Sequence, residues 1–201
     1  ERLLAPYRKE AGIATTADNY PNWENTGLDG HIGGHYLSAL ALMYAATGDQ
    51  AVLERLNYMV AELEKCQQAH GNGYVGGVPH GDKLWQQVAA GHIEADLFTL
   101  NQSWVPWYNL HKVFAGLRDA YLYTQNPTAK KMLVGFADWM LDLSRNLTDE
   151  QLQLMLRTEY GGLNETLADV YSITGQNKYL NLANRYTDQS LLHPLLQHQD
   201  K

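Results

Sequence analysis

The chain has 201 residues, of which 45% are hydrophobic and 18% are charged. This length suits one or two domains, and this balance is ordinary for a globular protein and excludes an intrinsically disordered chain. No run approaches the roughly 20 apolar residues of a membrane-spanning helix, so we expect no membrane partner. The formal net charge is −7 and the 15 lysines and arginines are scattered, which excludes the basic stripe of a nucleic-acid binder.

Cys66 is the single cysteine, which excludes an intrachain disulfide and a multi-thiolate metal site within this chain. We expect it to be a small buried residue on a helix. The 13 tyrosines and 5 tryptophans would suit sugar platforms and ordinary cores alike, so composition alone does not assign a function. The sequence starts at Glu1 without an initiator Met or a signal-peptide pattern, and we expect a segment of a longer protein.

Residues 34–46 are apolar nearly all round, which predicts a helix buried on both sides. Gly48 is the expected left-handed cap that ends this helix, and Asp49 is the expected N-cap of the next one. The next helix has one apolar stripe with charged residues outside it, consisting of Val52, Leu56, Met59, Val60, Leu63 and Cys66. This pair predicts an inner helix followed by an outer helix.

The same hairpin recurs twice. Residues 108–123 and 163–173 predict two further inner helices, and Asn126-Pro127 and Thr174-Gly175 mark the turns to their amphipathic partners. Aligning the turn threonines also aligns a leucine and a tyrosine in every repeat, namely Thr47, Thr124, Thr174, Leu40, Leu117, Leu167, Tyr44, Tyr121 and Tyr171. The repeat predicts an all-α fold, an α/α toroid of helical hairpins that forms part of an (α/α)6 barrel and is incomplete in this chain.

Two long connections, residues 72–82 and 101–107, are rich in glycine and aromatic residues. Long irregular connections within a compact domain are usually functional or disordered, and the aromatic content argues against disorder. We expect both segments at the rim of the central cavity of the toroid. Thr148 and Gln151 fit a capping box at the start of another helix.

Polar and aromatic residues cluster at the starts of the three inner helices, in residues 30–36, 107–112 and 159–165. Helix N-termini present free N–H groups and a positive dipole end, which favour hydroxyl or carboxylate partners. If these ends face one cavity, their side chains can bracket a sugar by hydrogen bonds and ring stacking. The candidate substrate-binding residues are His35, Trp107, His111, Glu159, Asn164 and Glu165.

Each candidate also has a purely structural interpretation. His31 and His35 have the i, i+4 spacing of a metal-binding pair but lack the glutamate of a zinc-protease helix, so we favour hydrogen-bonded structural histidines and predict no metal site. His111, on an apolar helix face, is either structural or a substrate contact. Glu159 and Glu165 are the candidates for buried carboxylates of the kind glycosidases use, and helix-start capping is the equal alternative.

Five segments resemble one family, in order along the chain. They are residues 2–13 (RLLAPYRKEAGI), 30–49 (GHIGGHYLSALALMYAATGD), 65–77 (KCQ…GYVGG), 105–123 (VPWYNLHKVFAGLRDAYLY) and 159–180 (EYGGLNETLADVYSITGQNKYL). These segments look like the bacterial β-L-arabinofuranosidases of glycoside hydrolase families 127 and 146. The NLHK and EYGGLNE phrases look closer to the second family.

The resemblance implies an α/α-toroid catalytic domain with trailing β-sandwich domains, which releases β-linked L-arabinofuranose from plant glycans with retention of configuration. It also implies a cysteine nucleophile held on zinc by further cysteines and a glutamate, all in a later part of the family's chain. Cys66 does not match that motif. We therefore expect residues 1–201 to be the N-terminal portion of the catalytic domain, inactive alone, with the zinc bound only by the full-length enzyme.

The resemblance also implies roles for residues of this chain. His111 in the LHK phrase is the principal implied sugar contact, followed by His35, Trp107, Asn164 and Glu165. The implied partners are an arabinose-containing oligosaccharide or polysaccharide and the remaining part of the same polypeptide. The substrate class implies a periplasmic or secreted location.

Two other functions fit the same pattern of residues. A non-catalytic helical module that binds glycans or another protein would fold alone and bind without cleavage. Another α/α-toroid sugar enzyme, such as an epimerase or an unsaturated glycuronyl hydrolase, would depend on Glu159 or Glu165 and would be unaffected by removal of zinc.

Overall fold

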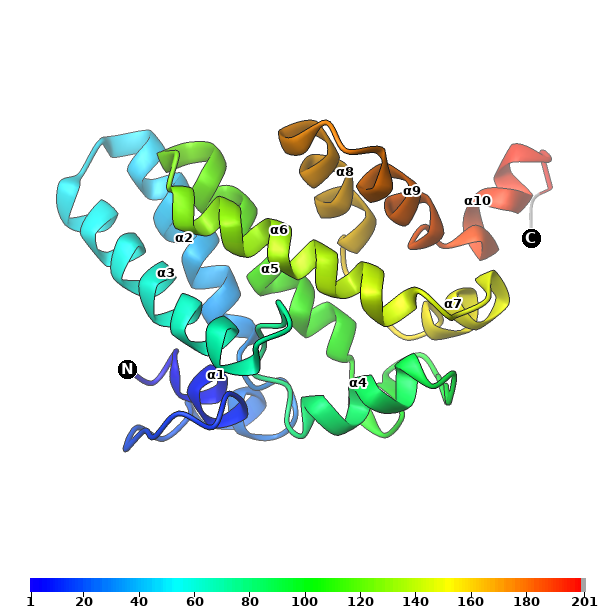
Figure 1. The fold of residues 1–201 in the computed structure, drawn as a ribbon, viewed down its shortest axis with the longest axis horizontal. Coiled ribbons are helices and arrows are strands. Elements are labelled where there is room, and N and C mark those ends of the chain that lie inside the picture. The colour runs from blue at the N-terminus through cyan, green and yellow to red at the C-terminus, as the bar shows by residue number, and fades with distance from the viewer. Residues whose placement is uncertain (200–201) are drawn as a thin grey trace.

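The computed structural model describes residues 1–199; the last two residues of the predicted domain, 200 and 201, lie outside the described residues. The regular structure of the described part is almost entirely helical, with one short β-hairpin (Figure 1). Its elements are α1 (Ala5–Glu10), the 3-10 helix η1 (Asn22–Asn25), α2 (His31–Thr47), α3 (Gln50–His70), α4 (Gly81–Ala89), β1 (Thr99–Leu100), β2 (Ser103–Trp104), α5 (Pro106–Thr124), α6 (Pro127–Ser144), α7 (Asp149–Met155), α8 (Leu163–Thr174), α9 (Asn177–Arg185) and α10 (Gln189–Leu196).

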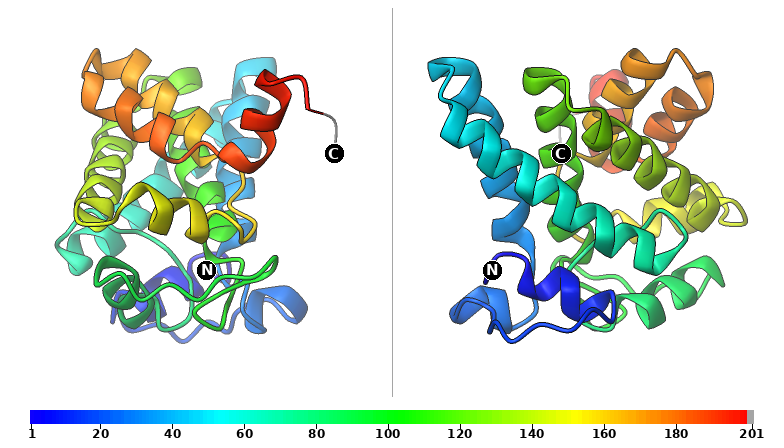
Figure 2. Two further views of the ribbon diagram at one scale, coloured as in Figure 1. Left: turned by 90° about the vertical axis from the view of Figure 1, so that its right-hand side faces the viewer. Right: turned by 60° about the vertical axis from the view of Figure 1, so that its left-hand side comes forward.

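The long helices form two layers of antiparallel hairpins. The inner layer is the row α2, α5 and α8, in which α5 packs against both of its neighbours. The outer helices α3, α6 and α9 each pack on the inner helix that precedes them in sequence (Figures 1 and 2). The predicted all-α arrangement of inner and outer helices is confirmed, and the first two inner helices begin slightly earlier than predicted, at His31 and Pro106.

Local sequence sets where these helices begin and end. Gly48 and Gly175 end α2 and α8 in the left-handed conformation, with φ of 67° and 70°, which glycine adopts without a steric penalty. The side chains of Asp49 and Asn126 cap α3 and α6 by accepting backbone N–H groups of the first turn. The predicted Thr148–Gln151 capping box begins α7.

The inner helices α2 and α5 touch through their backbones. A β-carbon on Gly34 would stand 2.2 Å from the carbonyl carbon of Lys112, and one on Gly116 would stand 2.8 Å from the carbonyl oxygen of Gly34. Any side chain at these two positions would force the helices apart. The two glycines therefore bring His35, which follows Gly34, beside the start of α5.

A group of buried aromatic rings fills the space between the layers. Trp107 stands between Trp85 and Tyr186, whose ring centroids are 4.6 Å and 5.6 Å from its own. The ring of Trp139 also packs against Trp107, with centroids 5.9 Å apart. Trp107 has no exposed surface. Cys66 is buried in the same core, as predicted.

The loop 72–82 lies at the end of the molecule where the inner helices begin. Gly77 stands against Gly30, which immediately precedes α2. Tyr74 and Val75 are buried, and so anchor the loop in the core. The sequence did not reveal α4, which starts inside this loop at Gly81 and is followed by the β1–β2 hairpin, an antiparallel pair in which Thr99 faces Trp104.

Toward their C-terminal ends, the inner helices α2 and α5 carry apolar side chains that are exposed to solvent. Leu42 and Met43 on α2 and Leu122 and Tyr123 on α5 are each about half exposed. No described helix is both long and apolar enough to span a membrane.

Candidate functional site

The starts of the three inner helices come together around the imidazole of His111 in α5. The backbone of Gly161, just before α8, lies against this ring. A β-carbon at position 161 would stand only 2.7 Å from His111 Nδ1. Lys112 Nζ is 3.3 Å from the same Nδ1 atom. The segment before α8 therefore packs against one side of the His111 ring. We call His35, His111, Lys112, Arg118 and Glu165 the inner-helix cluster.

His111 is held neutral by its surroundings. Burial, together with the positive charges of Lys112 and Arg118 and the neighbouring His35, lowers the pKa of its imidazole to about 4. A neutral imidazole has one donor and one acceptor nitrogen, and because the Lys112 ammonium stands at Nδ1, the Nε2–H group is the one left to donate to a sugar hydroxyl. The ring is half-buried, so part of it remains open to a ligand.

His35 and Lys112 extend the inner-helix cluster toward α2. Burial lowers the pKa of His35, and the charges of Lys112 and His31 add to this effect. Burial also lowers the pKa of Lys112, while the charge of Glu159 opposes the shift. The Lys112 ammonium stands 4.1 Å over the ring of Tyr108, which holds it in place by a cation–π contact.

Arg118 lies two helical turns after His111, on the same face of α5, and ties α5 to α8. Its Nη1 group donates to Glu165 Oε1 at 3.0 Å and to Asp169 Oδ2 at 2.8 Å. Its Nε group donates to Asp119 Oδ1 at 2.9 Å. The arginine thus fixes the position of Glu165 relative to His111. The sequence analysis did not select Arg118, although its spacing of two helical turns from His111 was a signal that could have identified it.

Glu159 and Glu165 are exposed, so the first of their two interpretations, as buried carboxylates, is wrong; Glu165 lies in the first turn of α8, where the helix-start alternative places it. The side chain of Glu165 is 68% exposed although it pairs with Arg118, and Glu159 is also exposed. The physical reason is that no part of the described chain packs over this face of the inner helices. Glu159 is held by its backbone, whose N–H donates to the carbonyl of Leu97 at 3.2 Å.

The remaining two candidates lie outside the inner-helix cluster. Asn164 donates to Thr187 Oγ1 at 3.4 Å, so its amide is directed to the segment after α9. Trp107 is a core residue, because its indole has no exposed surface and a side chain without exposed surface offers no face to a ligand. We leave Trp107 out of the proposed contacts.

The start of α2 is organised by Glu24, a fully buried carboxylate on η1 that sequence reasoning missed. Its oxygens accept the backbone N–H groups of Gly30 at 3.0 Å and Ile32 at 2.8 Å, and Oε1 is 2.8 Å from His31 Nδ1. This agrees with the interpretation of His31 as a hydrogen-bonded histidine. Glu24 lies outside the helix it caps, and no local pattern signals such a contact.

The possible metal ligands of the described residues are their His, Cys, Asp and Glu side chains. Among residues 1–199, no three His, Cys, Asp or Glu side chains come together as they would to hold a metal. The thiol of Cys66 is buried on α3, and burial raises its pKa to about 11. A protonated, buried thiol is neither a metal ligand nor a nucleophile.

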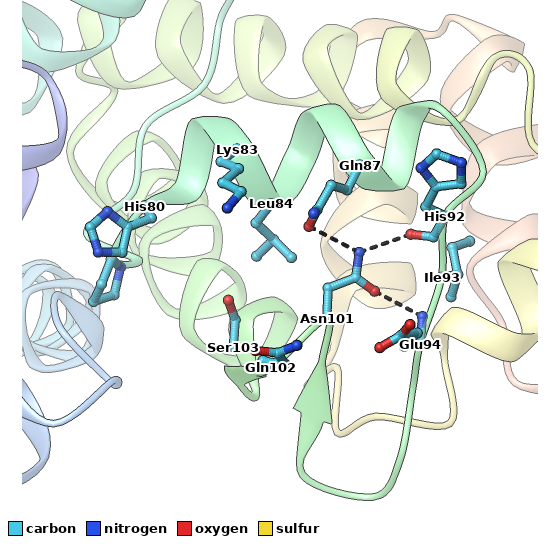
Figure 3. A pocket seen from close by; sticks show the side chains of 11 residues that line it. His80, Lys83, Leu84, Gln87, His92, Ile93, Glu94, Asn101, Gln102 and Ser103 are labelled. Atoms are coloured by element: carbon cyan, nitrogen blue, oxygen red, sulfur yellow. Dashed lines mark hydrogen bonds between the residues drawn. The ribbon is translucent and has the colours of Figure 1, made fainter.

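A cavity of about 880 Å³ lies apart from the inner-helix cluster, between α4 and the β1–β2 hairpin (Figure 3). Asn101 stands beside it and bridges its walls, donating to the carbonyl of His92 and accepting the N–H of Glu94, both at 2.8 Å. None of the residues predicted to bind substrate lines this cavity. It is therefore separate from the site that the inner helices form.

Comparisons with known proteins agree with this fold. The profile of the family described as "Beta-L-arabinofuranosidase, GH127 catalytic domain" matches residues 1–201. Among solved structures, the chain is similar to Ara127N-Se, a GH127 β-L-arabinofuranosidase from Geobacillus stearothermophilus T6, with a TM-score of 0.63 and 14% identity. That match covers 100% of this chain and 29% of the other, and at this identity it shows a shared fold. No curated protein sequence matches the chain.

Proposed function

The chain belongs to the GH127 β-L-arabinofuranosidase catalytic-domain family, and on that premise we propose that it forms part of the sugar-binding wall of a glycoside hydrolase. The enzyme would release β-linked L-arabinofuranose from plant glycans. The observation that carries this proposal is the neutral, half-buried His111, which Gly161 and Lys112 hold at the meeting point of three inner helices.

We assign the bond-breaking chemistry to polypeptide beyond these residues. The family resemblance implies a zinc-held cysteine nucleophile, and the residues of this chain do not fit such a centre, because its one cysteine is buried and protonated. The chain spans 29% of the length of the similar arabinofuranosidase, which leaves room for a separate catalytic part. Residues 1–201 would be the N-terminal portion of the catalytic domain and would be inactive alone.

The chemistry of the inner-helix cluster suits a hydroxyl-rich ligand. His111 supplies a donor at Nε2, because Lys112 occupies its Nδ1, Lys112 supplies further donors, and the exposed Glu165 carboxylate supplies acceptors. A few well-placed donors and acceptors are what fix the orientation of a bound ligand. The proposed partners are an arabinose-containing oligosaccharide or polysaccharide and the rest of the same polypeptide. The proposed location, from the substrate class, is periplasmic or secreted.

The test uses the complete polypeptide that contains this chain, with 4-nitrophenyl β-L-arabinofuranoside as substrate and the α-anomer as control. We expect hydrolysis of the β-anomer alone, and proton NMR should show β-L-arabinofuranose as the first product, as retention requires. Absence of hydrolysis of the β-anomer would contradict the proposal. Activity that survives zinc removal but disappears in Glu159→Gln or Glu165→Gln would favour a different toroid sugar enzyme.

A variant series links the activity to this chain. His111→Ala in the complete polypeptide should lower kcat/KM by about a hundred-fold, because it removes a group that hydrogen-bonds to the sugar. The matched control is Tyr123→Ala, which removes an exposed aromatic side chain at the C-terminal end of α5. It should change kcat/KM by less than about two-fold. Equal effects of the two substitutions would contradict a role for His111 in the site.

A further inference from the structure

Trp23, on η1, exposes 62% of its surface although it is a large apolar residue. It does not stand alone. Its ring lies edge to face with Trp104 on β2, with centroids 6.3 Å apart and planes at 83°. A second ring, His31, lies 6.5 Å away. These separations are those of aromatic contacts, so the indole is supported on two sides while much of its surface remains free.

His31 is fixed in one orientation by buried partners. Its ring is 8% exposed, and Nδ1 lies 2.8 Å from Glu24 Oε1 and 2.7 Å from the carbonyl oxygen of Leu28. Two acceptors at Nδ1 place the proton on that nitrogen. The opposite nitrogen, Nε2, has no hydrogen-bond partner among residues 1–199. It is therefore the atom of this ring that is left for a ligand.

The buried charge of Glu24 strengthens this arrangement. Its carboxylate has no exposed surface and is satisfied by two backbone N–H groups and His31. Burial acts to lower the pKa of His31, but the hydrogen bond and charge of Glu24 outweigh it, and the pKa is raised. A buried carboxylate that orients a histidine through Nδ1 is a common way of presenting Nε2 to a ligand.

Trp23 and His31 adjoin the inner-helix cluster. His31 and His35 are one helical turn apart on α2, with ring centroids 6.1 Å apart at 83°. His35 in turn lies within the electrostatic influence of Lys112 and His111. The rings of Trp23, His31 and His35 thus form a continuous path from the exposed indole to the proposed arabinose-binding residues.

We propose that Trp23 and His31 form a second sugar subsite, which binds the sugar unit to which the terminal arabinofuranose is attached. This proposal rests on the proposed function. A glycosidase must hold the groups on both sides of the bond it breaks. The indole provides a flat apolar surface for the C–H face of a sugar ring, and His31 Nε2 provides a hydrogen bond to one of its hydroxyls. Trp104 keeps the indole in place.

The experiment compares two substrates of the complete polypeptide that differ only in the group attached to the arabinose. Methyl β-L-arabinofuranoside has no second ring, and a β-L-arabinofuranosyl disaccharide has one. Trp23→Ala should raise KM for the disaccharide about ten-fold and leave KM for the methyl glycoside within about two-fold. Trp23→Phe should restore most of the loss, because it keeps an aromatic face. An aryl glycoside is unsuitable, since its own ring could stack on Trp23.

Tyr123→Ala removes another exposed aromatic side chain, 46% exposed against 62% for Trp23, and as the control it should change neither KM. His31→Phe should raise KM for the disaccharide alone, because it removes Nε2 and keeps the ring. The subsite is contradicted if Trp23→Ala affects both substrates equally or affects neither. It is also contradicted if that variant lowers the melting temperature and both activities together, which would mean that Trp23 packs against other polypeptide. A wild-type protein inactive on both substrates would instead overturn the proposed function itself, and the subsite with it.

Discussion

The imidazole of His111 lies against the backbone of Gly161, and a β-carbon at position 161 would stand 2.7 Å from its Nδ1 atom. This contact joins two inner helices at the point where the sequence places its polar residues. Gly161 has a φ of 64°, a left-handed conformation that residues with a side chain rarely adopt. The conformation and the contact both require glycine at this position.

Gly161→Ala in the complete polypeptide should therefore do two things. It should lower the free energy of unfolding by about 1 kcal/mol, because alanine is strained at positive φ. It should also lower kcat/KM about ten-fold or more, because the methyl group displaces His111. Gly175→Ala is the matched control, with a φ of 70° and no atom within 4 Å of the added carbon. It should reproduce the loss of stability without the loss of activity, and equal activity in the two variants would contradict the role of the contact.

Acid should destabilise the protein partly through His111. Its pKa is about 4 in the folded chain and 6.5 in the unfolded chain, so between these pH values the unfolded state binds a proton that the folded state does not. The free energy of unfolding therefore falls as the pH falls from about 6.5 to about 4. His35 and His70, whose pKa values are also lowered by burial, act with the same sign, and His31 acts with the opposite sign.

The measurement is denaturant unfolding at several pH values between 4 and 7, for the wild type and His111→Asn. The variant should flatten the dependence by up to about 1 kcal/mol per pH unit, since solvent screening reduces the full value for a half-buried group. Identical slopes for the two proteins would show that His111 is charged in the folded state at mildly acidic pH.

Cys66 should behave as a core residue and not as a nucleophile. Its thiol is buried, and burial raises its pKa to about 11. A thiol reagent at pH 8 should leave it unmodified in the native protein and react with it fully in denaturant. Cys66→Ala should lower the free energy of unfolding by about 1 kcal/mol and retain activity. Loss of activity with unchanged stability would give Cys66 a chemical role that its position does not support.

The three helical hairpins could be predicted from sequence because their signals are local. Gly48 and Gly175 end α2 and α8 where a left-handed residue is required, and Asn126 caps α6 within one turn. Apolar periodicity then distinguishes inner from outer helices. The placement of His111 at an inner-helix start was also predictable from the pattern, and the structure brings its ring to the meeting point of α5 and α8.

The features that the sequence did not predict depend on contacts between segments that are distant in sequence. Glu24 organises the start of α2 from outside that helix, and a lone glutamate in a loop gives no local signal of burial. Trp107 looks like a sugar platform in sequence because it precedes a polar helix start, but its side of α5 turns into the aromatic core. Glu165 on α8 pairs with Arg118 on α5 and stays exposed, because no described element covers this face of the inner helices. Its neighbours in sequence carry no information about that covering.

Residues 1–201 alone should associate in solution. Leu42, Met43, Leu122 and Tyr123 leave apolar surface exposed on two adjacent inner helices. Such surface favours self-association or contact with further polypeptide. Light scattering at rising concentration should show growing mass, and a Leu42→Ser, Met43→Ser double variant should shift the distribution toward monomer. A wild-type chain that stays monomeric and melts cooperatively would contradict this expectation.

The most direct measurement compares residues 1–201 with the complete polypeptide, assaying both for bound zinc and for hydrolysis of 4-nitrophenyl β-L-arabinofuranoside. We predict that the complete polypeptide binds zinc and turns the substrate over, that a chelator removes the activity and added zinc restores it, and that residues 1–201 show neither zinc nor turnover. Clear hydrolysis by residues 1–201 alone would contradict the assignment of this chain to the sugar-binding wall.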